Sequence, residues 1–180
     1  MNSPIKTFQT LSDTYQFLQD LGASPKLLLH IKLVGEAANL LVSKLHELEI
    51  KFDENFIHLG IAFHDAGKIL HPQELITKGN NHETDGEKLL ISQGVNPQLA
   101  RCCRSHGQWQ VMECSFEEIC VALADNLWKG KRNSQLEELF IQMLARRCHQ
   151  DYWGLFIEMD SCFEKIASDG DSRLMRSEIP

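Results

Sequence analysis

The chain has 180 residues, 43% of them apolar and 24% charged, which fits one globular domain and excludes a disordered or collagen-like chain. Its formal net charge of −7 disfavours nucleic acid as a partner, because nucleic-acid phosphates attract lysine and arginine. No stretch reaches the ~18 uncharged apolar residues of a membrane span, and residues 1–6 lack a signal-peptide pattern, so we expect a cytoplasmic protein without membrane contact.

Helices are predicted along the whole chain, because apolar residues recur at helical spacing between capping residues. Ser24 followed by Pro25 is typical of a helix start. Capping boxes at Thr84-x-x-Glu87 and Ser115-x-x-Glu118 open two more helices. The expected helices cover residues 12–21, 24–48, 53–66, 84–93, 96–106, 115–129, 133–148 and 154–167. A weak strand signal covers residues 109–114.

No repeat, linker or low-complexity tract divides the chain. We therefore expect an all-α fold, a compact single-domain helical bundle. An N-terminal segment with a short helix is expected at residues 1–23, the domain at residues 24–167, and a polar, frayed tail at residues 168–180. The amphipathic stretch that contains Leu136, Leu139, Ile141 and Leu144 suits either a homodimer interface or packing on the core.

Six cysteines are present, and none forms a C-x-x-C pair. We interpret them as reduced thiols that pack as small apolar residues. A zinc site built from Cys102, Cys103 and His106 is the weaker alternative, because it lacks a second spaced pair of ligands.

Four ionisable residues stand where the sequence predicts buried helix surfaces. His30 lies on the apolar stripe of a long helix, and His64 and Asp65 end the next apolar helix. Asp125 follows six consecutive apolar residues. A buried, unpaired carboxylate is costly, so it must be paired, protonated or bound to a metal. With no equally buried lysine or arginine to neutralise them, these residues predict a divalent-cation site.

Two further histidines fit the same site. His106 shares a helical face with Leu99, Cys102 and Cys103, which directs it towards the core. His82 stands in a polar turn before the predicted helix start, where a solvated loop histidine is the competing interpretation.

The order His30, His64-Asp65, Asp125 resembles the H…HD…D signature of the HD-domain superfamily of metal-dependent phosphohydrolases, over roughly residues 24 to 132. His82 and His106 match the two intervening histidines of members with a dinuclear centre. The run His64-Asp65-Ala66-Gly67-Lys68 also resembles the HDxGK form seen in cyclic di-GMP phosphodiesterases. The Gly-Tyr-Pro element of those enzymes is absent, however, and Gly107-Gln108-Trp109 stands in its place.

This resemblance implies a metal site and a reaction. One divalent ion would be held by His30, His64, Asp65 and Asp125. Asp65 would bridge to a second ion held also by His82 and His106. One or two ions of iron, manganese, zinc or magnesium fit these ligands. A metal-activated water would then attack the phosphorus of a nucleotide or another small phosphoester or phosphoanhydride.

Cationic residues near the motifs are expected to bind the substrate. Lys68 follows the His64-Asp65 pair by one turn, so Asp65 and Lys68 are the expected catalytic residues. Lys68, Arg101 and Arg104 are the expected substrate-binding residues, although both arginines also suit a solvated helix face. Trp109 and Trp128 suit either stacking on a nucleobase or core packing.

Two alternatives of function stay open at this point. The first is a mononuclear nucleotidase that uses only His30, His64, Asp65 and Asp125. The second is a catalytically inactive regulatory or binding module of the HD type. The leading expectation is an enzyme whose partner is a small phosphorylated substrate, with a homodimer as an open possibility.

Overall fold

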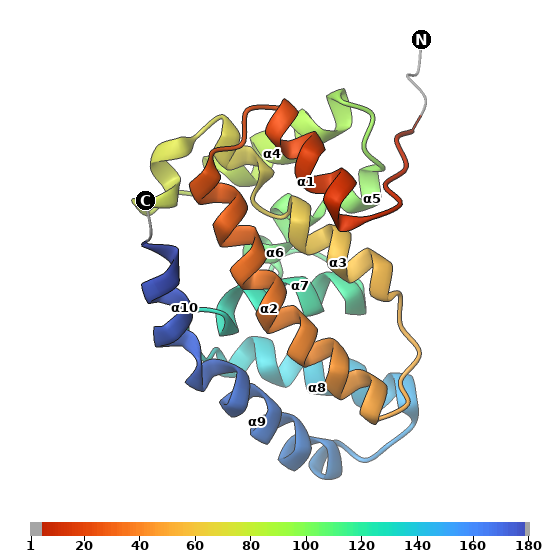
Figure 1. The fold of residues 1–180 in the computed structure, drawn as a ribbon. Coiled ribbons are helices and arrows are strands. Elements are labelled where there is room, and N and C mark those ends of the chain that lie inside the picture. The colour runs from red at the N-terminus through yellow and green to blue at the C-terminus, as the bar shows by residue number, and fades with distance from the viewer. Residues whose placement is uncertain (1–4, 179–180) are drawn as a thin grey trace.

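The structure of this protein, a computed structural model, is helical throughout the part of the chain that it describes, residues 5–178 (Figure 1). The all-α class predicted from the sequence is confirmed. Within the described residues no strand occurs, and residues 109–112 form a turn and a bend instead. Residues 1–4 of the predicted N-terminal segment and residues 179–180 of the predicted tail lie outside this part. Among the described helices, none combines the length and the hydropathy that crossing a membrane requires.

The elements follow one another with short connections. In chain order they are α1 (Leu11–Asp20), α2 (Pro25–Glu47), α3 (Glu54–Phe63), the 3-10 helices η1 (Ala66–Ile69) and η2 (Pro72–Leu75), α4 (Asn81–Ser92), α5 (Pro97–Ala100), α6 (Cys102–Gln108), α7 (Phe116–Leu127), α8 (Ser134–Cys148), α9 (Tyr152–Ser168) and α10 (Gly170–Ser177).

Helices α2 and α7 form the centre of the bundle. The Ser24 hydroxyl caps α2 by accepting a hydrogen bond from the backbone N–H of Leu27 at 3.1 Å. Both bonds of the predicted capping box between Ser115 and Glu118 are formed at the start of α7. Helix α7 is buried along most of its length because α2, α3, α6 and α8 pack around it. These two helices therefore carry His30 and Asp125 into the interior.

The predicted capping box at residues 84–87 is not formed, because α4 begins earlier, at Asn81. The carboxylate of Glu74, in η2, accepts hydrogen bonds from the backbone N–H groups of Asn81 at 3.2 Å and His82 at 3.1 Å. A side chain from another element thus satisfies the first N–H groups of α4. His82 consequently lies in the first turn of a helix and is buried, rather than in a solvated loop.

The helix predicted for residues 96–106 is formed as α5 and α6, which one residue of helical conformation, Arg101, joins. Helix α3 ends at Phe63, three residues before the predicted end, and η1 follows. The apolar stripe of α8 packs within this chain, since Leu136, Ile141 and Leu144 are buried in the core.

The C-terminal segment corrects the expectation of a frayed tail at residues 168–180. Residues 170–177 form α10, which lies beside α2 (Figure 1). The buried guanidinium of Arg173 donates hydrogen bonds from Nη1 to the carbonyl oxygens of Ile166 at 2.8 Å and Trp128 at 3.3 Å. On the surface of α10, Arg176 pairs with Glu36 of α2 through two hydrogen bonds of 2.7 and 2.6 Å. The segment is polar in sequence, yet these arginine contacts hold it on the bundle.

Candidate metal centre

Five elements bring the six predicted ligands to one place. His30 comes from α2, and the end of α3 carries two adjacent ligands, His64 and Asp65. The others are His82 of α4, His106 of α6 and Asp125 of α7. Four of the six lie on helices, and His64 and Asp65 form the short turn between α3 and η1, so the site is built on packed elements rather than on long loops.

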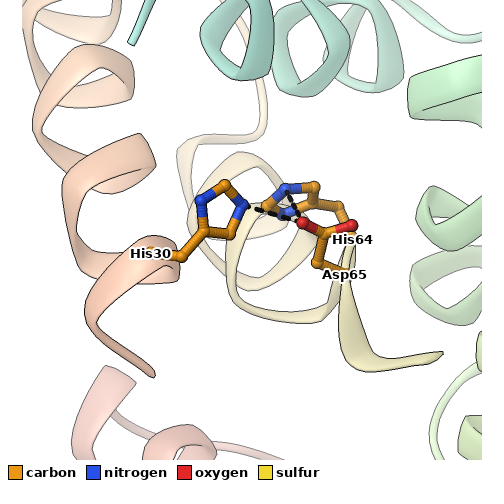
Figure 2. A group of neighbouring side chains, drawn as sticks. All are labelled: His30, His64 and Asp65. Atoms are coloured by element: carbon orange, nitrogen blue, oxygen red, sulfur yellow. Dashed lines mark ion pairs between the residues drawn. The ribbon is translucent and has the colours of Figure 1, made fainter. Parts of the chain in front are cut away.

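Asp65 lies at the centre of the group and is 1% exposed. Its Oδ2 atom lies 2.7 Å from Nε2 of His30 and 3.4 Å from Nε2 of His64 (Figure 2). Its Oδ1 atom lies 3.2 Å from Nε2 of His82 and 3.7 Å from Nε2 of His106. The two oxygens of one carboxylate therefore face two different pairs of histidines.

The arrangement contains two overlapping groups with the spacing of metal ligands. His30, His64 and Asp65 form one group, and Asp65, His82 and His106 form the other. Within each group the potential ligand atoms lie within 4.8 Å of one another. Asp125 adds a carboxylate oxygen 3.5 Å from Nε2 of His64, on the side of the first group.

Hydrogen bonds fix the orientation of three histidine rings. Nδ1 of His64 donates to the carbonyl oxygen of Ile61 at 2.7 Å, and Nδ1 of His106 donates to that of Cys102 at 3.0 Å. Nδ1 of His82 pairs with the Glu74 carboxylate. When Nδ1 carries the proton of a neutral imidazole, the lone pair is on Nε2. In all three rings Nε2 is the atom that faces Asp65.

Several of these inward-facing atoms have no hydrogen-bond partner. Within the described residues, Nε2 of His30, Nε2 of His64 and Oδ1 of Asp65 are buried and have no hydrogen-bond partner. A buried polar atom without a hydrogen bond costs free energy. A divalent cation among these atoms would remove this cost. Imidazole and carboxylate are ligands that suit such a cation, so the residues present fit a metal ion.

The charges of the metal-free protein also favour a positive charge between Asp65 and Asp125. Burial opposes ionisation of Asp65, but the neighbouring histidines hold its pKa well below the usual range. Burial likewise opposes ionisation of Asp125, and Lys129 and His64 lower its pKa. Burial opposes the charge on His64, yet Asp65 and Asp125 raise its pKa to about 10. Without an ion, a proton on His64 thus balances part of the negative charge of the two carboxylates.

Burial opposes the charge on His82, but Asp65 and Glu74 raise its pKa. The pKa values of the other two histidines shift downward. Burial lowers the pKa of His30 and lowers that of His106 to about 4. Both rings are therefore neutral near pH 7, which is the state in which imidazole binds a metal.

A cavity of about 670 Å³ opens onto these residues. Lys68 lines it and places Nζ 2.6 Å from Oδ2 of Asp65. Trp109 and Trp128 line it as well, and the Trp128 ring stands edge-on to His30 with ring centroids 4.9 Å apart. Three further lysines are among the lining residues: Lys26, Lys129 and Lys131.

The structure places the two predicted arginines elsewhere. Neither Arg101 nor Arg104 lines the cavity at the histidine cluster, and both line a separate groove. Arg101 pairs with Glu118 at 2.9 Å, and Arg104 pairs with Glu87 at 3.3 Å. In that groove, carboxylates of α7 and α4 pair with the two guanidinium groups. We therefore do not include them in the site.

The cysteines do not contribute to the cluster either. Cys102 and Cys103 are buried, and the Cys103 thiol donates a hydrogen bond to the carbonyl oxygen of Phe63 at 3.1 Å. Neither group of potential ligands found in the described residues contains a cysteine. This geometry agrees with thiols that pack as small apolar residues.

Two residues of the site were not identified from the sequence. Glu74 orients His82 from a different element, and no spacing or periodicity in the sequence connects these two residues. Lys26 stands four residues before His30 on the same helix, so the two side chains lie on the same face, one turn apart. This spacing could have identified Lys26 from the sequence.

A comparison with protein families gives a match to the HD domain over residues 27–128, more than half of the chain. The matched region runs from just before His30 to just after Asp125. No curated protein and no solved structure matches the chain.

Proposed function

Because the chain belongs to the HD domain family, which is part of a superfamily of metal-dependent phosphohydrolases, we propose that it hydrolyses a nucleotide or another small phosphoester or phosphoanhydride. We also propose that the centre is dinuclear. One observation supports a dinuclear centre: the two oxygens of Asp65 face two separate pairs of histidines.

The ligands divide between two ions as the geometry suggests. His30, His64, Asp65 and Asp125 would hold the first ion, and Asp65, His82 and His106 would hold the second. When bound, such ions lower the pKa of a coordinated water and neutralise charge on phosphoryl oxygens.

The residues of the chain itself supply position and charge around the substrate. Lys68 is held against Asp65 and lines the cavity, so its ammonium group is placed to bind a phosphoryl oxygen and take up developing negative charge. Trp128 packs edge-on against His30 and limits the movement of that ring.

The acidic net charge of −7 and a cavity of about 670 Å³ support a small phosphorylated compound, rather than nucleic acid, as the substrate. We propose a cytoplasmic location for this activity, as expected from the sequence.

The test is elemental analysis of protein purified without chelators, combined with an assay of phosphate release from a panel of nucleotides and phosphoesters. We expect about two ions per wild-type chain and about one in His82→Ala, together with strong loss of activity. Asp125→Ala is expected to weaken binding of the first ion. His46→Ala is the matched control, because His46 is exposed, pairs with Glu54 and belongs to neither ligand group.

The other outcomes point to specific alternatives. One ion per wild-type chain, with activity retained in His82→Ala, would identify a mononuclear nucleotidase. No ion, even after incubation with manganese or iron, would overturn the enzyme proposal and favour a regulatory or binding module.

A further inference from the structure

We propose that the substrate carries a second phosphate group, and that Lys26 and Lys131 bind it in the cavity beside the metal centre. This inference rests on the proposed function, since it specifies the substrate of the same site. It follows from where the lysines of the cavity lie and from which of them are already paired.

One of the two lysines lies on a helix that carries a predicted ligand, and the other follows such a helix in the chain. Lys26 lies in the first turn of α2, one turn before His30 and on the same face. Lys131 follows the end of α7, the helix that carries Asp125. Both lysines line the cavity that contains His30 and Asp125. Two separate chain segments thus bring ammonium groups to one site.

The other two lysines of the cavity have carboxylate neighbours. Lys68 lies 2.6 Å from Oδ2 of Asp65, and Lys129 lies 3.9 Å from Oδ2 of Asp125. Within residues 5–178, Lys26 and Lys131 form no ion pair with any carboxylate. Their positive charges are therefore available to a ligand in the cavity.

Two further carboxylates line the cavity and do not change this conclusion. Glu83 accepts a hydrogen bond from the side-chain amide of Gln108 at 2.7 Å and forms no ion pair with a lysine. Glu178 follows α10 at the cavity wall and makes no ion pair in the described residues. Within the described residues, Lys26 and Lys131 thus remain the two ammonium groups of the cavity lining that no carboxylate pairs with.

The cavity is also larger than a single phosphate group requires. Its volume of about 670 Å³ falls within the range of pockets that enclose whole small molecules, roughly 300–1,000 Å³. It extends from the histidine cluster to Leu174 and Ser177 of α10. A substrate bound by the metal centre through one phosphate therefore has room to place a second phosphate near Lys26 and Lys131.

The experiment compares nucleotides that differ by one phosphate. Binding of adenosine 5′-monophosphate, adenosine 5′-diphosphate and adenosine 3′,5′-bisphosphate to the manganese-loaded full chain is measured by titration calorimetry. We expect at least one of the two doubly phosphorylated probes to bind about tenfold or more tightly than the monophosphate, because charge-assisted hydrogen bonds to lysine are added. The double variant Lys26→Met/Lys131→Met should lose most of this advantage and keep the wild-type affinity for the monophosphate.

The control is Lys32→Met/Lys78→Met, which removes the same total charge from two exposed positions that do not line the cavity. It should keep the advantage of the second phosphate. The inference is overturned if neither doubly phosphorylated probe binds more tightly, if the Lys26/Lys131 variant keeps the advantage, or if the control variant loses it too.

Metal content and phosphate release, measured on the same samples, separate this inference from the proposed function. A preference for the second phosphate without phosphate release from any compound would support the lysine site and count against the hydrolase. Phosphate release without any such preference would support the hydrolase and refute the lysine site.

Discussion

Glu74 holds His82 at two points, because its carboxylate accepts a hydrogen bond from the backbone N–H at 3.1 Å and pairs with Nδ1 of the ring. Glu74 is buried. Burial opposes its ionisation, but the hydrogen bonds from His82 and Asn81 lower its pKa to about 2. A carboxylate that stays charged at neutral pH therefore fixes the ring so that Nε2 faces Asp65.

The first prediction tests this orientation. Glu74→Gln keeps the size of the side chain and removes its charge, so the His82 ring becomes less basic and less firmly held. We expect the ion near His82 to bind about tenfold to a hundredfold more weakly, measured by metal titration of the chelator-treated protein. Glu87→Gln is the control, since Glu87 pairs with Arg104 outside the cavity. Equal metal affinities in Glu74→Gln and wild type would show that Glu74 does not position the ligand.

The second prediction concerns the close approach of η1 and α4. A Cβ atom at Gly67 would lie 1.9 Å from the backbone oxygen of His82, so Gly67→Ala must push these segments apart. We expect a loss of about 3 kcal/mol or more in unfolding free energy, measured by urea denaturation. Gly35→Ala gives the contrast, because nothing lies within 4 Å of a Cβ there and it is in mid-helix. That variant should gain about 0.5–1 kcal/mol; equal effects at the two positions would contradict the packing.

The third prediction concerns the attachment of α10. Arg173→Met would leave the carbonyl oxygens of Trp128 and Ile166 without the hydrogen bonds that they accept from Arg173. We expect a loss of roughly 2–4 kcal/mol in unfolding free energy. Amide hydrogen exchange should also increase in α10. Arg176→Met removes an exposed arginine of the same helix and should change stability much less. A stable Arg173→Met variant with unchanged exchange in α10 would refute the role of this contact.

The fourth prediction is a pH dependence of the metal-free protein. The pKa of His64 is raised to about 10, above the value of about 6.5 for an unfolded histidine. A raised pKa means that protonation stabilises the fold; this contribution is complete below pH ~6.5 and is lost as the pH rises through the folded value. The melting temperature of chelator-treated protein should therefore fall between pH 7 and pH 10.

Two comparisons make the pH prediction specific to His64. The variant His64→Gln should lose most of the fall, because it has no proton to release over this range. Saturating manganese should also reduce the fall in the wild type, since a bound cation replaces the proton between Asp65 and Asp125. A melting temperature that is independent of pH in the chelated wild type would contradict the charge balance described for this site.

Local patterns in the sequence were sufficient to predict most of the helices and the family. Ser24, Pro25 and the Ser115 capping box mark helix starts correctly, because capping depends on neighbours within one turn. The positions of His30, His64 and Asp65 in apolar helices indicated a buried cluster, because helical periodicity specifies which side chains face the interior. The HD domain match covers these same residues.

The tertiary structure decided what depends on residues far apart in the chain. Glu74 starts α4 and orients His82, whereas the capping box expected at Thr84 is not used. The pairing of Arg104 with Glu87, outside the cavity, is also set by packing. The polar residues of the C-terminal segment did not predict helix α10, which Arg173 attaches to the bundle. In each case the free energy comes from a hydrogen bond or ion pair between distant segments, and only the folded chain brings those partners together.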